Sequence, residues 1–164
     1  MQDPLRTPLH RLHIARKARM FIFAGWEMPL WYTRTSEEVL AVRNNAGLFD
    51  ISHMGRFLIE GLDAEALLQY TTSNDVSRLT PGRAHYTTVT NERGGIKDDE
   101  VILRLGEEKF LEVTNSATRT KIWSWMNKIS REKRFNVSLK DETFTSTMLA
   151  LQGPRSIDIM EEIA

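Results

Sequence analysis

The sequence predicts an α+β fold, an antiparallel sheet with helices packed on one face. The segments follow the order strand, helix, strand, strand, strand, helix, strand. Several of the turns between strands are only a few residues long, and no repeat period is visible. Short turns join antiparallel neighbours, because a parallel crossover needs about a dozen residues or more. Helices that are interspersed with such strands pack against the sheet.

The composition is that of a globular protein and excludes several classes of function. Of the 164 residues, 41% are hydrophobic and 27% are charged, which fits one domain or a piece of a larger protein and excludes a disordered chain. The 22 basic and 22 acidic residues cancel, so no net field attracts nucleic acid or an anionic membrane. The chain has no cysteine, which excludes disulfides, thiolate metal sites and cysteine nucleophiles. With no membrane-spanning run and no signal-peptide core, we expect a cytoplasmic protein.

The N-terminal region predicts a helix followed by an aromatic loop. Residues 9–20 mix basic and apolar side chains in the manner of an amphipathic helix with a solvated face. Residues 21–32 contain five aromatic side chains, interrupted by Gly25 and Pro29. Such a segment suits a loop that lines a pocket for a flat ring system, and it equally suits plain core filling under a loop.

A second helix and an irregular segment follow. Thr35 and Glu38 have capping-box spacing and predict a helix over residues 36–46, with Val39, Leu40 and Val42 on its buried side. Residues 48–55 fit neither helical nor strand periodicity. His53 in this segment is a base or ligand, or a hydrogen-bonded structural residue; no second histidine lies at metal-ligand spacing.

The rest of the chain alternates between strands and helices. Residues 117–131 carry Ile122, Trp123, Met126 and Ile129 at three- and four-residue steps, which predicts a helix with these four side chains in the core. The other expected elements are strands at 57–60, 86–90, 101–105, 110–114, 136–139 and 147–151, a helix through 67–70, and a helix after Gly153-Pro154.

The central feature is a glycine-centred hairpin that carries two adjacent carboxylates. Gly94 and Gly95 permit a turn, after which Asp98 and Asp99 begin a strand. Because side chains alternate across a strand, Asp99 shares a face with Val101 and the other apolar odd-numbered residues, and we expect this face to be the apolar one. A carboxylate there meets a polar ligand, or else stays solvated at the sheet edge as an ordinary turn residue. The glycines match no phosphate-binding loop, and no Gly-x-Ser-x-Gly elbow is present.

Seven segments resemble, in the same order, the N-terminal part of aminomethyltransferase, the T-protein of the glycine cleavage system. They are Thr7-Pro-Leu9, Phe23-Ala-Gly-Trp-Glu-Met-Pro29, Ala41-Val-Arg43, Gly47-Leu-Phe-Asp-Ile-Ser-His-Met-Gly55, Asn74-Asp75, Gly94-Gly-Ile-Lys-Asp-Asp99 and Leu151-Gln-Gly-Pro154. The similarity runs from about Thr7 to the end of the chain. The fold it implies is the folate-binding fold of the T-protein type, in truncated form.

The resemblance implies a tetrahydrofolate-binding protein that takes an aminomethyl group from lipoylated H-protein, releases ammonia and forms methylenetetrahydrofolate. The family's motif implies that Asp99 contacts the folate and is catalytic. Its acceptor oxygen would orient the nucleophile and stabilise the positive charge that develops in the reaction. By the same matching, Met54, Tyr86, Val101 and Asn115 line the folate site, and no metal is implied. We expect Asp99 to project into a cavity walled by residues near Trp26, Met54 and Tyr86.

The resemblance also implies an organisation into domains. Residues 1–54 would be the first segment of a discontinuous folate-binding domain, residues 55–142 an antiparallel subdomain with the Asp98-Asp99 hairpin, and residues 143–164 an incomplete return segment. Family members are roughly twice this size or more, above the usual single-domain range. We therefore expect uncovered apolar surface that recruits a second polypeptide with the missing half, or another copy of the chain.

Departures from the family pattern leave alternatives open. Glu100 stands where the family usually has leucine, Leu103 where tyrosine is frequent, and Thr118 where a second asparagine is usual. One alternative is a folate-binding module without turnover. Another is a relative that uses a different one-carbon donor, such as sarcosine or dimethylglycine, since those enzymes share the fold.

Overall fold

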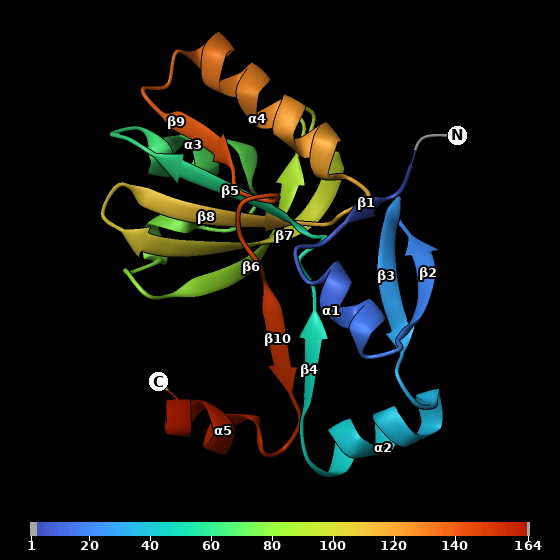
Figure 1. Cartoon of the computed structure of the whole chain (residues 1–164). Coiled ribbons are helices and arrows are strands. Elements are labelled where there is room, and N and C mark those ends of the chain that lie inside the picture. The colour runs from blue at the N-terminus through green and yellow to red at the C-terminus, as the bar shows by residue number, and fades with distance from the viewer. Residues whose placement is uncertain (1–2, 164) are drawn as a thin grey trace. The chain divides into compact units, whose positions relative to one another are not determined.

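The computed structural model describes residues 3–163, which form two compact units. The hairpin unit contains residues 54–143, and the terminal unit contains residues 3–53 and 144–163. Figure 1 shows the elements of both units. The α+β class expected from the sequence is confirmed, because antiparallel sheets and helices make up both units.

The hairpin unit is built on a five-stranded antiparallel sheet (Figure 1). The strand order is β6-β7-β8-β5-β9, and each pair of neighbours is antiparallel. The strands are β5 (Gly55–Glu60), β6 (Ala84–Thr90), β7 (Ile96–Gly106), β8 (Lys109–Thr114) and β9 (Ser138–Asp141). The hairpin expected around the two glycines is the β6–β7 pair, which confirms the antiparallel prediction at the centre of the chain.

Helices cover one face of this sheet and close the core. They are α3 (Ala64–Thr71), the short 3₁₀ helix η1 (Val76–Arg78) and α4 (Arg119–Lys133). The core contains Phe57, Ile59, Leu67, Leu68, Ile102, Phe110, Ile122, Met126 and Ile129. Three of the four core positions expected on α4 are buried, but Trp123 is only half-buried and packs on Phe57 with ring centroids 4.8 Å apart. Trp125 is the buried tryptophan of this helix.

Two carboxyl groups lie inside this core. Glu100 is 1% exposed and Glu112 is 0% exposed. None of their carboxyl oxygens has a hydrogen-bond partner within residues 3–163. Burial raises the pKa of both carboxyl groups, and for Glu100 the adjacent Glu112 carboxyl raises the pKa further.

The terminal unit holds two smaller sheets. A three-stranded sheet has the order β1-β3-β2, with β1 parallel to β3 and β2 antiparallel to it, and a two-stranded ribbon pairs β10 with β4. The elements are β1 (Leu5–Arg6), α1 (His10–Ala15), β2 (Arg19–Phe23), β3 (Trp26–Trp31), α2 (Thr35–Asn44), β4 (Gly47–Asp50), β10 (Leu149–Gln152) and α5 (Ser156–Ile163). Of the irregular segment expected at 48–55, residues 51–54 are indeed outside any helix or strand, whereas residues 48–50 belong to β4 and Gly55 begins β5.

The aromatic segment 21–32 is a β-hairpin, and the expectation of a loop was wrong. Gly25 takes φ +81° at the turn, where an L side chain is disfavoured. Pro29 is tolerated inside β3 because the pairing with β2 shifts register beside it, between Arg19 and Met20. Trp26 does not wall an open cavity: it is 2% exposed and stacks on Phe144 at 5.6 Å.

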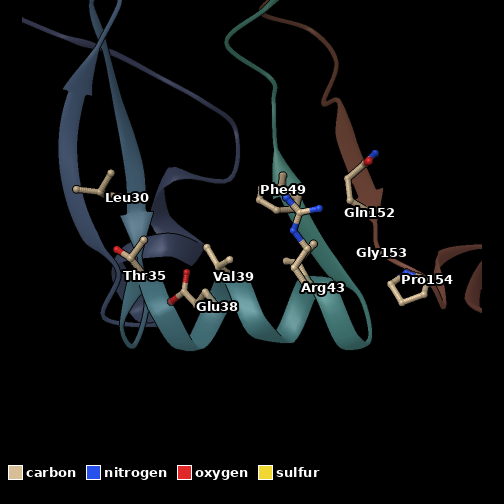
Figure 2. Close-up of a pocket in the computed structure, with 10 residues that line it drawn as sticks. Leu30, Thr35, Glu38, Val39, Arg43, Phe49, Gln152, Gly153 and Pro154 are labelled. Atoms are coloured by element: carbon tan, nitrogen blue, oxygen red, sulfur yellow. The ribbon is translucent and has the colours of Figure 1, made fainter.

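Helix α2 begins one residue earlier and ends two residues earlier than the predicted range 36–46, and it does not have the predicted burial. None of its residues is buried, and Val39 and Leu40 are 50% and 59% exposed. The capping box also differs, because Glu38 Oε1 accepts hydrogen bonds from the backbone N–H of Tyr32 and Thr33, before the helix. The apolar side of this helix faces open space in the terminal unit (Figure 2).

Candidate functional site

The central hairpin positions the candidate residues through its turn and register. The turn closes where Gly94, with φ +77°, donates its N–H to the carbonyl of Asn91 at 2.9 Å. From there the β6–β7 register places Tyr86 opposite Val101 and Thr88 opposite Asp99. Tyr86 and Asp99 are thus on neighbouring strands, one diagonal step apart, and on the same face of the sheet.

Asp99 lies on the opposite face from the core, so the expectation that it shares the apolar face was wrong. The core face of β7 carries Asp98, Glu100 and Ile102, all buried, whereas Asp99 is exposed and Val101 is half-buried. The apolar residues at odd-numbered positions of β7 had suggested that the odd-numbered side chains face the core. A buried glutamate in the core set is what breaks the usual alternation.

The carboxylate of Asp99 is held by two side chains of the predicted set. The Tyr86 hydroxyl donates to Asp99 Oδ2. Asn115 Nδ2 donates to the backbone carbonyl of Asp99 at 2.9 Å and approaches Oδ1 at 3.4 Å. Asn115 follows β8, and the register Val101 to Val113 continues to place it across from Asp99. Three predicted residues are therefore joined by hydrogen bonds.

Met54 lies in the same row at this end of the sheet. It precedes Gly55, which pairs with Thr114, so the β5–β8 register places Met54 across from Asn115. Its carbonyl accepts a hydrogen bond from Arg56 Nη1 at 2.7 Å, and Arg56 is itself 3% exposed. Backbone register thus brings Met54 and Asp99 to either side of Asn115.

Asp98 is the structural partner of Asp99, a role that the sequence did not reveal. Its carboxylate accepts hydrogen bonds from Thr114 Oγ1 and Asn115 Nδ2, each at 3.0 Å, and from Thr118 Oγ1. Burial alone would raise the pKa of Asp98, but the donors Thr118, Asn115 and Thr114 outweigh it and hold the pKa below its ordinary value. Asp98 therefore ties β7 to the end of β8 and to Thr118, the residue that precedes α4.

Thr118, a departure from the family pattern, has a defined place in this network. It precedes α4, donates its backbone N–H to the Asn115 carbonyl at 3.2 Å, and directs its hydroxyl to Asp98. The hydroxyl thus supplies a donor at a position where the family usually has an amide. Leu103, another departure, is half-buried on the face of Asp99, whereas Glu100 is in the core.

A second polar cluster lies in the terminal unit, and sequence reasoning missed it. His13 is 5% exposed and bridges the Tyr32 hydroxyl, 2.7 Å from Nδ1, and Asp50 Oδ2, 2.8 Å from Nε2. Thr7 Oγ1 also donates to Asp50 Oδ2, at 2.6 Å. Burial raises the pKa of Asp50, but the hydrogen bonds from Ser52, Thr7 and His13 hold it below its ordinary value. This cluster joins α1, the residue that follows β3, and β4, which are far apart in sequence.

His53, the histidine singled out in the sequence, packs in the terminal unit. Its ring meets Phe23 edge-on with centroids 5.6 Å apart. Among residues 3–163, no group of three or more histidine, aspartate or glutamate side chains is arranged to hold a metal ion. None of the helices described in that range is long and apolar enough to cross a membrane.

Comparison with known proteins identifies the family. The family described as GCVT N-terminal domain matches residues 9–164. The chain belongs to this family. An aminomethyltransferase of Thermus thermophilus is 45% identical over 156 residues, and one of a Thermotoga species is 42% identical over 158 residues. These alignments cover 95% and 96% of this chain but 44% and 43% of the relatives.

A solved structure shows the same fold in the GCVT N-terminal domain family. The glycine cleavage system aminomethyltransferase T of Bartonella henselae matches with a TM-score of 0.88 at 34% identity, over 96% of this chain and 43% of that protein. The chain thus spans less than half the length of the aminomethyltransferases it matches, and it corresponds to their N-terminal part.

Proposed function

We propose that this chain supplies the tetrahydrofolate-binding N-terminal part of an aminomethyltransferase. The reaction takes an aminomethyl group from lipoylated H-protein, releases ammonia and forms methylenetetrahydrofolate. The observation that carries the proposal is the Tyr86–Asp99–Asn115 cluster on the open face of the hairpin unit's sheet. It supports the proposal because the three residues that the family motif assigns to the folate site are joined to one another by hydrogen bonds.

The residues on this face fit a folate in chemical character. Tyr86 is 62% exposed and offers an aromatic surface on which a flat ring can stack, and Val101 beside it is half-buried and apolar. Asp99 offers acceptor oxygens to ring N–H groups, which suit a heterocycle with several N–H donors. Met54 and Asn115 complete the set of proposed folate-binding residues.

Asp99 is the proposed catalytic residue, and its task is positioning and charge stabilisation. Tetrahydrofolate, when bound, supplies the nitrogen atoms that accept the one-carbon unit. The Tyr86 hydroxyl donates to Oδ2 of Asp99, and Oδ1, which Asn115 Nδ2 approaches at 3.4 Å, keeps a lone pair that can accept a hydrogen bond from a ligand. A fixed negative charge at this place stabilises positive charge that develops beside it. Asp98 cannot take this role, because three donors already occupy its carboxylate.

We further propose a domain assignment. The terminal unit would be the discontinuous folate-binding domain, and the hairpin unit the subdomain that carries the Asp98-Asp99 hairpin. Lipoylated H-protein is the proposed donor partner, as for glycine cleavage T-proteins in general. A donor such as sarcosine or dimethylglycine is the competing assignment, which a transfer assay with each donor distinguishes.

A folate-binding module without turnover is the second candidate. The openness of the site favours it, since Tyr86 and Asp99 are both exposed and water competes with every hydrogen bond to a ligand. This candidate shares the binding residues and differs only in the absence of transfer.

The test of binding is a fluorescence titration of the chain with tetrahydrofolate. We expect saturable binding that Asp99→Asn weakens by about ten- to a hundredfold, since a hydrogen bond to a charged group is worth about 1.5–3 kcal/mol. Asp158→Asn is the matched control, because the Asp158 side chain is 64% exposed in the terminal unit. Equal affinities for the wild-type chain and Asp99→Asn would contradict the placement of folate at Asp99.

A further inference from the structure

The side chain of Asn115 connects the two adjacent aspartates of the hairpin. Its Nδ2 group donates to Asp98 Oδ1 at 3.0 Å and to the backbone carbonyl of Asp99 at 2.9 Å. An amide nitrogen carries two hydrogen atoms, so these two hydrogen bonds use both of them. The strand segment at Asp99 is thereby tied to Asn115, and Asn115 is tied to Asp98.

These two contacts also decide which way the Asn115 amide faces. A carboxylate oxygen and a backbone carbonyl are both acceptors, so only the nitrogen end of the amide can meet them. Rotation of the amide by half a turn would place its oxygen against the Asp98 carboxylate, acceptor against acceptor. Asn115 Oδ1 is therefore directed away from Asp98, and within residues 3–163 it accepts no hydrogen bond. This oxygen stays available as an acceptor.

Two hydroxyl groups fix Asp98 on its other side. Asp98 is 8% exposed, and its Oδ2 atom accepts hydrogen bonds from Thr114 Oγ1 and Thr118 Oγ1. These bonds hold the carboxylate so that Oδ1 meets Asn115. Thr118 precedes α4, and its backbone N–H donates to the Asn115 carbonyl. The Thr118 hydroxyl therefore fixes the place of the Asp98 carboxylate, and the carboxylate fixes the amide of Asn115.

This series of contacts ends at the proposed folate site. We propose that Asp98 and Thr118 are positioning residues for that site. Through Asn115 they hold Asp99 in place and make the site present hydrogen-bond acceptors to its ligand. The Tyr86 hydroxyl also uses its proton on Asp99, so the ligand groups selected there are N–H or O–H donors. The inference rests on the proposed folate site and adds two residues to it.

Thr118→Val tests the proposal, because valine keeps the shape of threonine and removes only the hydroxyl. We expect the tetrahydrofolate affinity of the chain, measured by fluorescence titration, to fall by about three- to tenfold, the usual effect of the loss of one hydrogen bond. Thr118→Ser keeps the hydroxyl and should bind as tightly as wild type. Thr120→Val is the matched control, at an exposed threonine in the first turn of the same helix.

A double-mutant cycle shows whether Thr118 acts through Asn115. In an Asn115→Ala background, Thr118→Val should cause no further loss of affinity, because the amide that it positions is absent. A residue that only supports the fold of the hairpin unit would have the same effect in both backgrounds. Equal losses in the two backgrounds would overturn the proposal, and so would wild-type affinity in Thr118→Val.

The side-chain amide signals of Asn115 give a second test that needs no ligand. Nitrogen-15 NMR spectra of the chain contain these signals, and their loss in Asn115→Ala assigns them. Thr118→Val should move them, whereas Thr120→Val should leave them in place; unchanged signals in Thr118→Val would overturn the positioning role. If the wild-type chain did not bind tetrahydrofolate, the proposed function would fail, and the amide signals would still decide whether Thr118 positions Asn115.

Discussion

Tyr86 and Asp99 are joined across the β6–β7 pair by a hydrogen bond from the phenol to the carboxylate, on the face of the sheet opposite the core. This contact fixes the orientation of an exposed acidic side chain that would otherwise sample several rotamers. Its neighbour Asp98 points the opposite way and is saturated by protein donors. The hairpin therefore presents one carboxylate to a ligand and uses the other to hold itself to α4.

Removal of the Tyr86 hydroxyl tests whether Asp99 is the carboxylate that the hairpin presents to a ligand. Tyr86→Phe keeps the ring but loses the donor to Asp99, so we expect tetrahydrofolate affinity to fall by about three- to tenfold, or about 1 kcal/mol for one hydrogen bond. Tyr70→Phe is the matched control, at a tyrosine that is 45% exposed elsewhere in the hairpin unit. Fluorescence titration of both variants gives the comparison. An unchanged affinity in Tyr86→Phe would show that Asp99 needs no orientation by the phenol.

Substitution of Asp98 tests whether this buried carboxylate holds the hairpin to α4. Asp98→Asn leaves only one acceptor oxygen for three donors, so we expect the free energy of unfolding to fall by about 1–3 kcal/mol. Asp99→Asn should change the unfolding free energy by less than about 0.5 kcal/mol, because its side chain is exposed. Urea titrations at pH 7 measure both. A larger loss of stability in Asp99→Asn than in Asp98→Asn would reverse the assignment.

The buried Glu100 and Glu112 predict an unusual dependence of stability on pH. In the unfolded chain both carboxyl groups have a pKa of about 4.3, whereas burial raises their pKa in the folded chain. Above that pH the folded state binds more protons than the unfolded state, so stability falls as pH rises toward the folded pKa values, by up to about 1.4 kcal/mol per pH unit for each group. The contribution of Asp98 to stability depends on pH in the opposite direction. Its pKa is lowered in the folded chain, so this stabilisation is lost only as pH falls below about 4.

Glu100→Gln isolates this effect. The amide has nearly the same shape and no charge, so we expect the variant to gain stability relative to wild type as pH rises from about 5 to about 8, and to show a shallower decline. Glu107→Gln, with a side chain that is 86% exposed, serves as the control. Urea midpoints at both pH values measure the difference. Parallel pH profiles for wild type and Glu100→Gln would mean that Glu100 is not protonated in the folded state.

Much of the fold was predictable because the strands and helices of the hairpin unit follow their periodicities closely. The failures have specific causes. The side of the sheet that Asp99 occupies was misassigned because Glu100 occupies a core position, and a glutamate there breaks the binary pattern. The hairpin at β2–β3 was missed because Pro29 reads as a strand breaker, whereas the register shift beside it accommodates the ring. The exposure of α2 could not be predicted from its amphipathic pattern. Such a pattern indicates which side of a helix is apolar, but it does not indicate whether other structure covers that side.

The candidate site was accessible to the sequence only through the family motif. Spacing alone identified the Asp98-Asp99 pair, but it could not separate the structural carboxylate from the exposed one. That distinction depends on Asn115 and Thr118, which reach Asp98 from 17 and 20 residues away. The His13 network escaped detection for the same reason, since Tyr32 and Asp50 lie 19 and 37 residues away from His13.

The central claim is that the carboxylate at position 99 supports one-carbon transfer, and the most direct measurement is ammonia release from aminomethylated, lipoylated H-protein in the presence of tetrahydrofolate. The assay uses a chimera in which this chain replaces the matching N-terminal part of the Thermus thermophilus aminomethyltransferase. We predict turnover by the wild-type chain and a loss of about 10²- to 10³-fold in kcat for Asp99→Asn, the usual cost of removing one stabilising group from a reaction centre. Full activity in Asp99→Asn would contradict the account.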